Sequence, residues 1–520
     1  MWGSQYWWHN SSCYYAALIS AGCTELAESF LSHMENWRNA CEKAAVQQWG
    51  AEGLWIPETT WFNGPEEIPE KLQEEFIALY TCRKKWEERS ETFKKFAEGR
   101  NSFDTRYSYI SHRDDGCAER GFGVFGYVSH IFSTTAKIAY WMWKYFLILD
   151  DRQWLREKAY PFIRGAANLY VTLPLITEGR DGKLHIAHCN NHESVWNCKD
   201  AVSELSAMHG ILPIAIKAAE LLAADKERIP VWKSFLNRLT PIPTSTEKDA
   251  LVTGEEQNEC WGSARSKGQY GGASFEHISD PIVLYDYCTP ETDNADIRKI
   301  GKNTLGMIMK HYGYGKKVQV NTLDMCVDAV SRSCIPGAME EFVIAMHDLD
   351  SYEQDFTDLK GCAYTKILAN RMTLREGPQA LDVQRLGHIT SSMVNAVCQG
   401  YPKAPGEEPV LYLFSSLPEK WDARIRMQTI GGWQVEACAA AGKCTEATLT
   451  GSKRPLRIRN PWGEKPVLII SETGEEIQKG QYLTVRRDCR IRPVDTAIFS
   501  SESAVPAQCS AYRWSDRSDF

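Results

Sequence analysis

One short stretch of the chain concentrates side chains that can bind and cleave sugars. Residues 188–197 read His-Cys-Asn-Asn-His-Glu-Ser-Val-Trp-Asn, which places one carboxylate among three amides, two imidazoles and an indole. Amides and imidazoles hydrogen-bond to sugar hydroxyls, and a glutamate beside a tryptophan can be kept protonated for acid catalysis. A polar connector whose asparagines serve turns and caps is the alternative. We interpret the stretch as a loop between two helical segments, with Glu193 as the candidate general acid.

Glycosidic bond cleavage needs a second carboxyl group, which in an inverting enzyme stands roughly 6.5–9.5 Å from the first. Asp382 is the candidate base, although a helix N-cap or a salt bridge with Arg385 is the better explanation of this carboxylate. Two other acidic clusters compete with it, Glu276 and Asp280 around His277, and Asp114, Asp115 and Glu119 in one long loop. The sequence alone does not rank these groups.

Candidate substrate contacts lie where predicted helices end and polar loops begin. Around Glu193 they are Asn190, Asn191, His192 and Trp196. Elsewhere they are Trp7, Trp8, His9 and Asn10 at the first helix, Tyr107, His112 and Arg113 in a long polar loop, and Arg385 and His388 near Asp382. A tryptophan is more often a core residue than a sugar platform, so packing explains Trp7 and Trp8 as well as binding does.

Sequence signatures of other kinds of site are missing. His185 and His188 are three residues apart, while His277 is isolated in the sequence from other metal ligands. There is no HExxH motif and no Cys/His set with zinc spacing. A P-loop and a GxSxG motif are missing too, and no strand precedes the glycine-rich residues 121–126. We therefore expect neither a metal nor a cofactor.

Composition restricts the classes of partner. The chain has 520 residues, a formal net charge of −8 and 43% hydrophobic residues. No Lys/Arg-rich run is present, so we expect no nucleic-acid partner. We also expect no membrane span, because no stretch of 18 apolar residues exists. The 17 cysteines lack CxxC pairs and indicate reduced thiols, and no signal peptide is visible, so we expect a cytoplasmic protein whose partner is a carbohydrate.

The elements that must position these residues are mostly helices up to residue 400. Apolar residues recur at helical spacing over four strong segments. They cover Thr24–Gly50, Thr134–Leu149, Trp154–Tyr170 and Ala201–Ala224, and weaker candidates cover Asp296–His311, Gly337–His347 and Ile389–Gln399. A tight connection at Asp150-Asp151-Arg152-Gln153 indicates that helices recur as antiparallel pairs.

The pattern changes to short alternating runs after Gly400, with prolines at 402, 405 and 409. These runs predict an antiparallel β-sandwich over residues 401–500, followed by a frayed, Ser-rich tail at 501–520. Helix pairs followed by a sandwich indicate a mainly α protein, an (α/α)6 toroid catalytic domain over residues 1–400 with a small β domain. An α-solenoid is the weaker alternative, because no fixed-period repeat is present.

Four segments resemble glycoside hydrolase family 95, which contains α-L-fucosidases and α-L-galactosidases. They are Trp7–Ala17, similar to the family's opening helix; Ala136–Tyr170, similar to its helical hairpin; Asn191-His192-Glu193-Ser194, at the place of its S-P-E-N acid motif; and Leu417–Trp421 with Gly431–Val435, at its entry to the C-terminal β domain. The resemblance implies a six-hairpin toroid glycosidase and singles out Glu193 as the acid.

The chain departs from that family in three places. We expect the given residues to begin at the toroid, with no counterpart of the family's N-terminal β domain among them. Positions near Trp7 and His9 replace two asparagines that hold the attacking water, and only Asn10 is close. In the base motif Q-I-D-G-N-F-G, Val383 stands at the expected position and Asp382 is displaced by one residue.

We expect a glycoside hydrolase that removes a terminal fucoside- or galactoside-like sugar by acid/base catalysis with inversion. The alternatives are a catalytically degenerate carbohydrate-binding protein, which these departures favour, and a toroid glycosidase of another specificity such as rhamnosides. Fold analogy alone does not supply a function.

Overall fold

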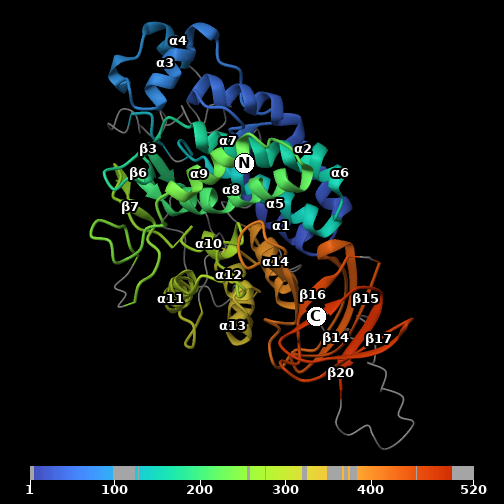
Figure 1. Cartoon of the computed structure of the whole chain (residues 1–520). Helices are drawn as coiled ribbons and strands as arrows, with labels where there is room; N and C mark the ends of the chain where they lie inside the picture. The colour runs from blue at the N-terminus through green and yellow to red at the C-terminus, as the bar shows by residue number, and fades with distance from the viewer. Residues whose placement is uncertain are drawn as a thin grey trace, which may run out of the picture.

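Helices form the N-terminal part of the molecule and strands the C-terminal part (Figure 1). The computed structural model describes residues 5–97, 123–126, 128–253, 258–275, 277–318, 325–347, 366–367, 373–374, 383–451 and 454–494. Its α-helices are α1 (Trp8–Ser20), α2 (Thr24–Ala44), α3 (Glu70–Tyr80), α4 (Glu91–Ala97), α5 (Ser133–Leu149), α6 (Arg152–Trp154), α7 (Tyr160–Thr172), α8 (Val202–Leu222), α9 (Arg228–Arg238), α10 (Asp280–Val283), α11 (Ala295–His311), α12 (Cys326–Arg332), α13 (Pro336–His347) and α14 (Val383–Val397).

Helix boundaries follow from local chemistry. Helix α2 continues into a π-helical turn, Ala45–Trp49, which ends at Gly50 with a left-handed φ of 64°. The predicted connection after α5 is also present. Asp150 has a φ of 56°, and the carboxylate of Asp151 accepts the backbone N–H groups of Gln153 and Trp154 to cap α6. This cap turns the chain back, so that α7 packs on α5.

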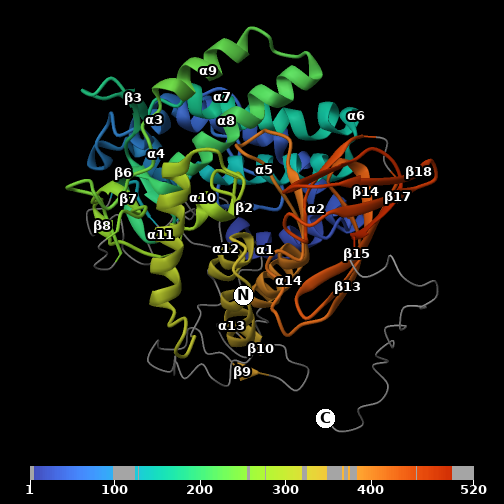
Figure 2. The ribbon, with the colours of Figure 1, turned by 60° about the horizontal axis from the view of Figure 1, so that its bottom comes forward.

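Helices from distant parts of the sequence close a ring of contacts. Within the described residues, α1 contacts α5, α5 contacts α8, α8 contacts α10, α10 contacts α12, α12 contacts α14, and α14 returns to α1. Other helices pack outside this ring, including α2 on α1, α7 on α8, and α13 on α12 and α14. Figure 2 shows α1, α12 and α14 grouped together. The first and last described helices therefore complete the ring together.

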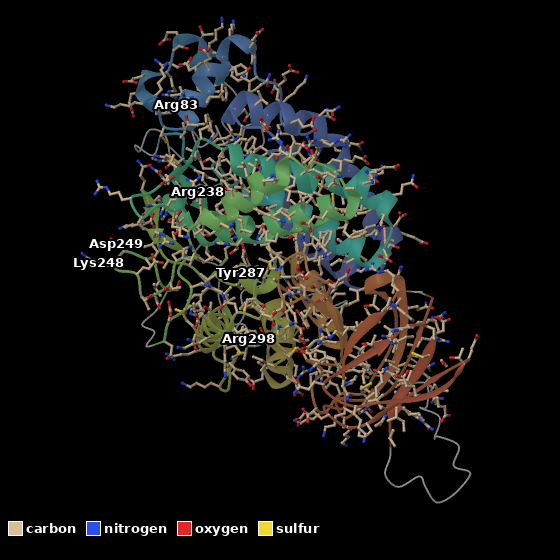
Figure 3. All side chains as sticks on the ribbon, viewed as in Figure 1. Arg83, Arg238, Lys248, Asp249, Tyr287 and Arg298 are labelled. Atoms are coloured by element: carbon tan, nitrogen blue, oxygen red, sulfur yellow. The ribbon has the colours of Figure 1, made fainter. Side chains whose placement is uncertain are left out.

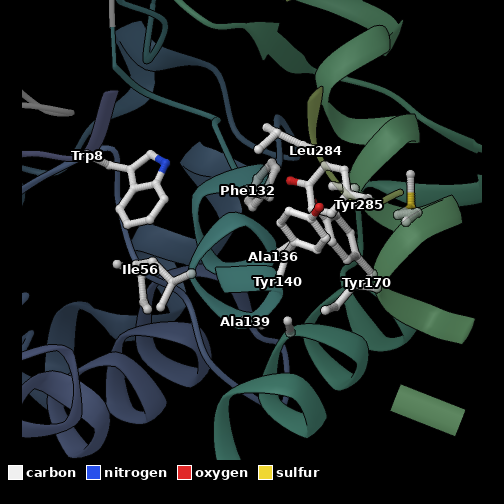
Figure 4. Packing of buried hydrophobic residues seen from close by; sticks show 14 of the residues in the cluster. Trp8, Ile56, Phe132, Ala136, Ala139, Tyr140, Tyr170, Leu284 and Tyr285 are labelled. Atoms are coloured by element: carbon white, nitrogen blue, oxygen red, sulfur yellow. The ribbon is translucent and has the colours of Figure 1, made fainter. Parts of the chain in front are cut away.

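The core of the helical part is rich in aromatic side chains. Tyr140 of α5 lies 5.5 Å from Tyr285 between ring centroids, and Figure 4 shows both beside Tyr170 of α7. Helix α8 is long and apolar enough to cross a membrane by length and composition alone, but 72% of its most apolar window is buried in this core. Charged residues such as Arg83, Lys248 and Asp249 lie at the exposed periphery (Figure 3).

Ten short strands are described in the helical part. They are β1 (Gln5–Trp7), β2 (Thr59–Trp61), β3 (Ile176–Glu178), β4 (Leu184–Ile186), β5 (Cys189–Asn191), β6 (Val195–Ala201), β7 (Ala264–Ser266), β8 (Tyr270–Gly271), β9 (Lys366–Ile367) and β10 (Thr373–Leu374). Strands β5 and β6 pair antiparallel, with Asn191 opposite Val195. The sequence predicted a loop here, but the stretch is a β-hairpin. Strand β6 is largely buried and pairs with β7 and β8, which stabilises the hairpin.

Two sheets form the C-terminal part. Their strands are β11 (Cys398–Tyr401), β12 (Val410–Leu413), β13 (Ala423–Thr429), β14 (Trp433–Ala440), β15 (Lys443–Thr450), β16 (Leu456–Arg459), β17 (Val467–Ser471), β18 (Gly474–Gln478), β19 (Tyr482–Val485) and β20 (Cys489–Pro493). The sheet orders are β11-β12-β16-β19 and β13-β14-β15-β20-β17-β18, and one core lies between the sheets.

The expected helical part followed by a β-rich part is confirmed, but the sandwich is not wholly antiparallel. Strands β12 and β16 run parallel, with Leu411 opposite Ile458. The chain leaves the first sheet after β12, forms β13, β14 and β15 in the second sheet, and only then returns. Two strands joined by such a crossover can run parallel, which a hairpin does not allow.

The sandwich is fastened to the helical part by specific polar contacts. Tyr412 and Tyr482 of the sandwich both donate their hydroxyl groups to buried Glu291, over 2.5 and 2.9 Å. Arg454 pairs with Asp150 at the end of α5. All the described cysteines are free thiols.

Candidate functional site

A cavity lies inside the helix ring. Its walls come from α1, α5, α10, α12 and α14, so residues from both ends of the helical part meet in it. It encloses about 590 Å³ when the space open to solvent is included. The residues that give it chemical character are Trp8, His9, Lys137, Trp141, Lys144, Asp328, Arg332, His388, Ser391 and Asn395. Ligand sites of other proteins typically combine apolar walls with such a small set of polar groups.

Lys137 is the most exceptional group in the wall. Its side chain is 2% exposed, and within the described residues its ammonium makes no hydrogen bond and no ion pair. Burying an ammonium without a direct partner costs on the order of several kcal/mol of folding free energy. The carboxylates of Glu58 and Glu204 act on it only at longer range. The amine is therefore placed to donate to whatever occupies the cavity.

His388 of α14 faces the same cavity and is oriented by a carboxylate. Its Nδ1 lies 2.7 Å from Oδ2 of Asp328, which comes from α12. Its Nε2 is buried, and no described residue hydrogen-bonds to it. A carboxylate that holds one nitrogen of an imidazole leaves the other nitrogen to exchange a proton with a ligand. The pair is thus a possible proton acceptor or donor.

A charge network closes another side of the cavity. Arg332 donates to Asp286 over 2.8 Å, the Lys144 ammonium lies 3.7 Å from the same carboxylate, and the Tyr140 hydroxyl donates to it over 3.1 Å. Burial lowers the pKa of Lys144, an effect that Asp286 opposes. Because every charge here has a direct partner, this network serves mainly to join α5, α12 and the segment after α10.

Three buried imidazoles meet next to the cavity. His9 is in the first turn of α1, His192 in the turn between β5 and β6, and His277 directly before α10. Their ligating nitrogen atoms all lie within 4.8 Å of one another. His9 also lines the main cavity and, together with His277, a smaller one. No metal signature is visible in the sequence, because His277 is far from the other two histidines along the chain.

Glu58 holds this cluster of histidines in place. Its Oε1 accepts the backbone N–H of His9 over 2.7 Å and lies 3.7 Å from Nε2 of His192, and its Oε2 accepts the hydroxyl of Thr134. Burial acts to raise the pKa of Glu58. The hydrogen bond and charge of His192, helped by Lys137 and His9, outweigh burial and lower the pKa to about 2.

The hairpin residues that the sequence singled out are divided between structure and site. Asn190 is structural, because its amide donates to the carbonyl of Gly126 and its Oδ1 accepts the N–H of Asn197. Trp196 is 1% exposed, packs on Tyr270 and donates to the carbonyl of Glu193. Neither side chain is available to a substrate.

Asn191 and Glu193 differ from these neighbours. Asn191 is fully buried, and neither of its side-chain polar atoms hydrogen-bonds to a residue that the structure describes. Glu193 is half-buried in the β5–β6 turn and is not part of the described cavity wall. The hairpin therefore delivers His192 to the histidine cluster, whereas Glu193 is not among the described residues that line the cavity.

The other expected contacts are distributed unevenly. Trp8, His9 and His388 line the cavity. Trp7, the last residue of β1, and Asn10, in the first turn of α1, are not among its lining residues. Asp382, Tyr107, His112 and Arg113 lie outside the described residues, as do the competing carboxylates Asp114, Asp115, Glu119 and Glu276. Arg385 lies in α14, and its side chain is outside the description. Asp280 is buried and holds Nδ1 of His277 over 3.0 Å.

Sequence reasoning missed Lys137, Asp328 and Glu58. Lys137 lies within a strongly apolar helical segment, and a lysine on the buried face of such a helix is a signal that periodicity could have provided. Asp328 and Glu58 carried no comparable signal, because their partners are remote in the chain.

Comparisons with known proteins do not place the chain in a family. No family model matches it, and no curated protein matches it. Among solved structures, one described as "Putative kojibiose phosphorylase from human microbiome" is similar over 93% of this chain and 60% of that one. The identity is 10% and the TM-score 0.47, so this likeness is too weak to bear on function. The chain spans about 60% of the length of that structure.

Proposed function

We propose that the chain is a carbohydrate-processing enzyme that hydrolyses a terminal sugar by acid/base catalysis in the cavity of the helix ring. The supporting observation is the composition of the cavity wall. The wall combines the indoles of Trp8 and Trp141 with the ammonium of Lys137, which has no direct partner among the described residues, and with the oriented imidazole of His388. Apolar surfaces suit the faces of a sugar, and the polar groups suit its hydroxyls.

We further propose that the closed circuit of α1, α5, α8, α10, α12 and α14 is the inner ring of an (α/α)6 toroid. In that architecture the loops at one end of the inner helices build the pocket. The β5–β6 hairpin leads into ring helix α8, and the segment with His277 leads into ring helix α10, so both bring their histidines to His9. The resemblance to family 95 agrees with this arrangement, and fucosides and galactosides are therefore the first substrates to try.

Two groups are proposed for proton transfer. Glu193 is the proposed general acid on the strength of the resemblance. Asp328 is the carboxylate that the described cavity wall provides, and it acts through His388. These roles make separate predictions, because Glu193 donates to the leaving oxygen whereas the Asp328–His388 pair activates water.

The test is a screen of the purified full-length chain against aryl α- and β-glycosides of fucose, galactose and rhamnose. Hydrolysis of any of them supports the proposal. Glu193→Gln and Asp328→Asn are then expected to lower kcat by roughly 10²–10⁴-fold each. Glu446→Gln is the matched control, since Glu446 pairs with Arg490 on the surface of the sandwich and should leave turnover unchanged. Turnover that survives Glu193→Gln would remove Glu193 as the acid.

A carbohydrate-binding protein without catalysis is the second candidate. Its specific support is that Glu193 is not in the described wall, where Asp328 is the one carboxylate. Saturable sugar binding by calorimetry, combined with no hydrolysis of any glycoside in the screen, would establish this candidate and overturn the enzyme.

A further inference from the structure

We propose that His9, His192 and His277 bind one divalent transition-metal ion, with Zn²⁺ as the best match. Three imidazoles with a fourth position left open is a common ligand set of zinc sites that also hold a water or a substrate oxygen. Imidazole also suits copper, nickel and iron, whereas calcium and magnesium prefer oxygen ligands. The proposal does not rest on the proposed function.

Burial and distance support a shared ion. The three side chains are 9%, 3% and 1% exposed, and their ligating atoms lie within 4.8 Å of one another. Zinc–nitrogen bonds of about 2.0–2.1 Å in a tetrahedron place two ligand nitrogens roughly 3.4 Å apart. The rings therefore need to move by on the order of 1 Å to bind, which small changes in side-chain torsion supply.

The surroundings of His277 match those of a metal ligand. Its Nδ1 is held by both carboxylate oxygens of Asp280, at 3.0 and 3.1 Å, and its Nε2 is buried with no hydrogen-bond partner in the described structure. Metal-ligating histidines almost always donate their second nitrogen to a carboxylate, carbonyl or water, which fixes the tautomer. A buried nitrogen lone pair that faces two other imidazoles is poorly satisfied unless a cation lies among them.

The backbone around His192 indicates that its position is imposed. His192 has a φ of 51°, in the left-handed region that is uncommon for residues other than glycine. Such conformations persist where the surrounding structure holds them, and they cluster at functional sites. Glu58 lies 3.7 Å from Nε2 of His192 and also anchors the backbone of His9, so one carboxylate positions two of the three rings.

The fourth coordination position would face the cavity, because His9 lines it. A metal there supplies a Lewis acid that can hold a water molecule or a sugar hydroxyl. The metal site and the Lys137–His388 wall would then contact the same ligand.

The test is metal binding by the intact chain after treatment with a chelator and dialysis. Titration with Co²⁺ should give the visible absorption of a low-coordinate imidazole complex, saturating at one ion per chain, and Zn²⁺ should displace it. His9→Gln, His192→Gln and His277→Gln should each weaken binding by more than about 100-fold, because each removes a ligand. His209→Gln is the control: this histidine is bonded to the carbonyl of Thr240, away from the cluster, and the variant should bind like wild type.

A milder variant keeps the proposal testable if a ligand variant fails to fold. Asp280→Asn retains an acceptor for Nδ1 of His277 but removes the charge, and loss of such a partner costs roughly 10–100-fold in metal affinity. No binding by wild type, or binding that all three glutamine variants and Asp280→Asn retain, would overturn the proposal. Metal binding without hydrolysis of any glycoside would count against the proposed function only.

Discussion

Two buried lysines in the same cavity are in opposite situations. Lys144 lies 3.7 Å from Asp286 in a paired network, whereas the ammonium of Lys137 has no direct partner among the described residues. We expect Lys144→Met to lower the free energy of unfolding by on the order of 2 kcal/mol or more, because it breaks a buried charge network. We expect Lys137→Met to stay within about 1 kcal/mol of wild type, since the lost attraction to Glu58 and Glu204 is offset by a lower desolvation cost.

Urea unfolding measures the free energy of unfolding of both lysine variants. Calorimetry with the sugar found in the glycoside screen measures their ligand affinity. Lys137→Met should bind that sugar at least tenfold more weakly, since the loss of one charged hydrogen bond costs about 1.5 kcal/mol or more. Equal destabilisation by the two variants, with sugar affinity retained, would show that Lys137 is a structural residue.

The buried imidazole of His130 makes the free energy of unfolding depend on pH. Burial lowers the pKa of His130 to about 3, whereas the unfolded chain takes up the proton near 6.5. Between those pH values the unfolded state binds a proton that the folded state does not, so stability falls as pH falls, by up to about 1.4 kcal/mol per unit. The contribution is constant above pH 6.5 and changes no further below about pH 3.

His130→Asn should flatten this slope, because asparagine does not titrate and tolerates the left-handed φ of 55° at this position. Urea unfolding of both proteins between pH 4 and 8 is the measurement. His33→Asn is the comparison: burial also lowers the pKa of His33, but that ring is only half-buried and should change the slope less. An unchanged slope in His130→Asn would contradict the assignment.

At the residue scale the sequence identified chemical types better than roles. It selected Trp8, His9, His192 and His388, which the structure does bring to the cavity or its edge. The same reasoning selected Asn190 and Trp196 as substrate contacts. In the structure, Asn190 hydrogen-bonds to Gly126 and Trp196 packs on Tyr270, so both are structural residues of the hairpin region. No local pattern distinguishes a buried amide that bonds to its own hairpin from one that faces a ligand.

At the scale of elements, α8 and the segment directly after α10 come into close contact at a glycine. A Cβ atom added to Gly210 would lie 2.1 Å from Cβ of Tyr285, which is backbone-proximal and unable to move aside. Gly210→Ala should therefore cost about 1–3 kcal/mol or more through overpacking. Thermal unfolding followed by circular dichroism measures the loss.

Gly306 in α11 is the matched control. A Cβ atom there would meet nothing within 4 Å, so Gly306→Ala should raise stability by about 0.5–1 kcal/mol through reduced backbone entropy in the unfolded chain. A stabilising Gly210→Ala would show that α8 does not pack against Tyr285 as described.

Helices with a strong apolar period were the elements that sequence predicted best. The segments expected at Thr134–Leu149 and Ala201–Ala224 correspond to α5 and α8 within a few residues. The β5–β6 hairpin was missed because its strands hold asparagines and cysteines, and pairing with β7 and β8, not β propensity, stabilises it. The π-helical turns at Ala45–Trp49 and Leu155–Ala159 have no sequence signature.

At the scale of the whole molecule, Glu291 couples the sandwich to the helical part. Because two phenols from the sandwich donate to this one buried carboxylate, Glu291→Ala should cost about 2 kcal/mol or more. Differential scanning calorimetry should show one transition for wild type and a lower, broader or divided transition for the variant. Glu446→Ala, which breaks a surface pair within the sandwich, should stay within about 0.5 kcal/mol of wild type.

The global arrangement was predictable only in outline. A change from helical to strand periodicity near Gly400 revealed the order of the two parts. The ring closure by α1 and α14, and the parallel pair of β12 and β16, depend on contacts between remote segments that no window of the sequence contains.

Ring closure has a consequence for biosynthesis. His388 is translated 379 residues after His9 (388 − 9), and both line one cavity. A nascent chain therefore has no complete binding site until α14 has docked on α1. Long-range closure of this kind is slow compared with local helix formation, and the half-built ring exposes its apolar interior meanwhile. We therefore expect synthesis to depend on chaperones, because the site is assembled from segments that lie far apart in the chain.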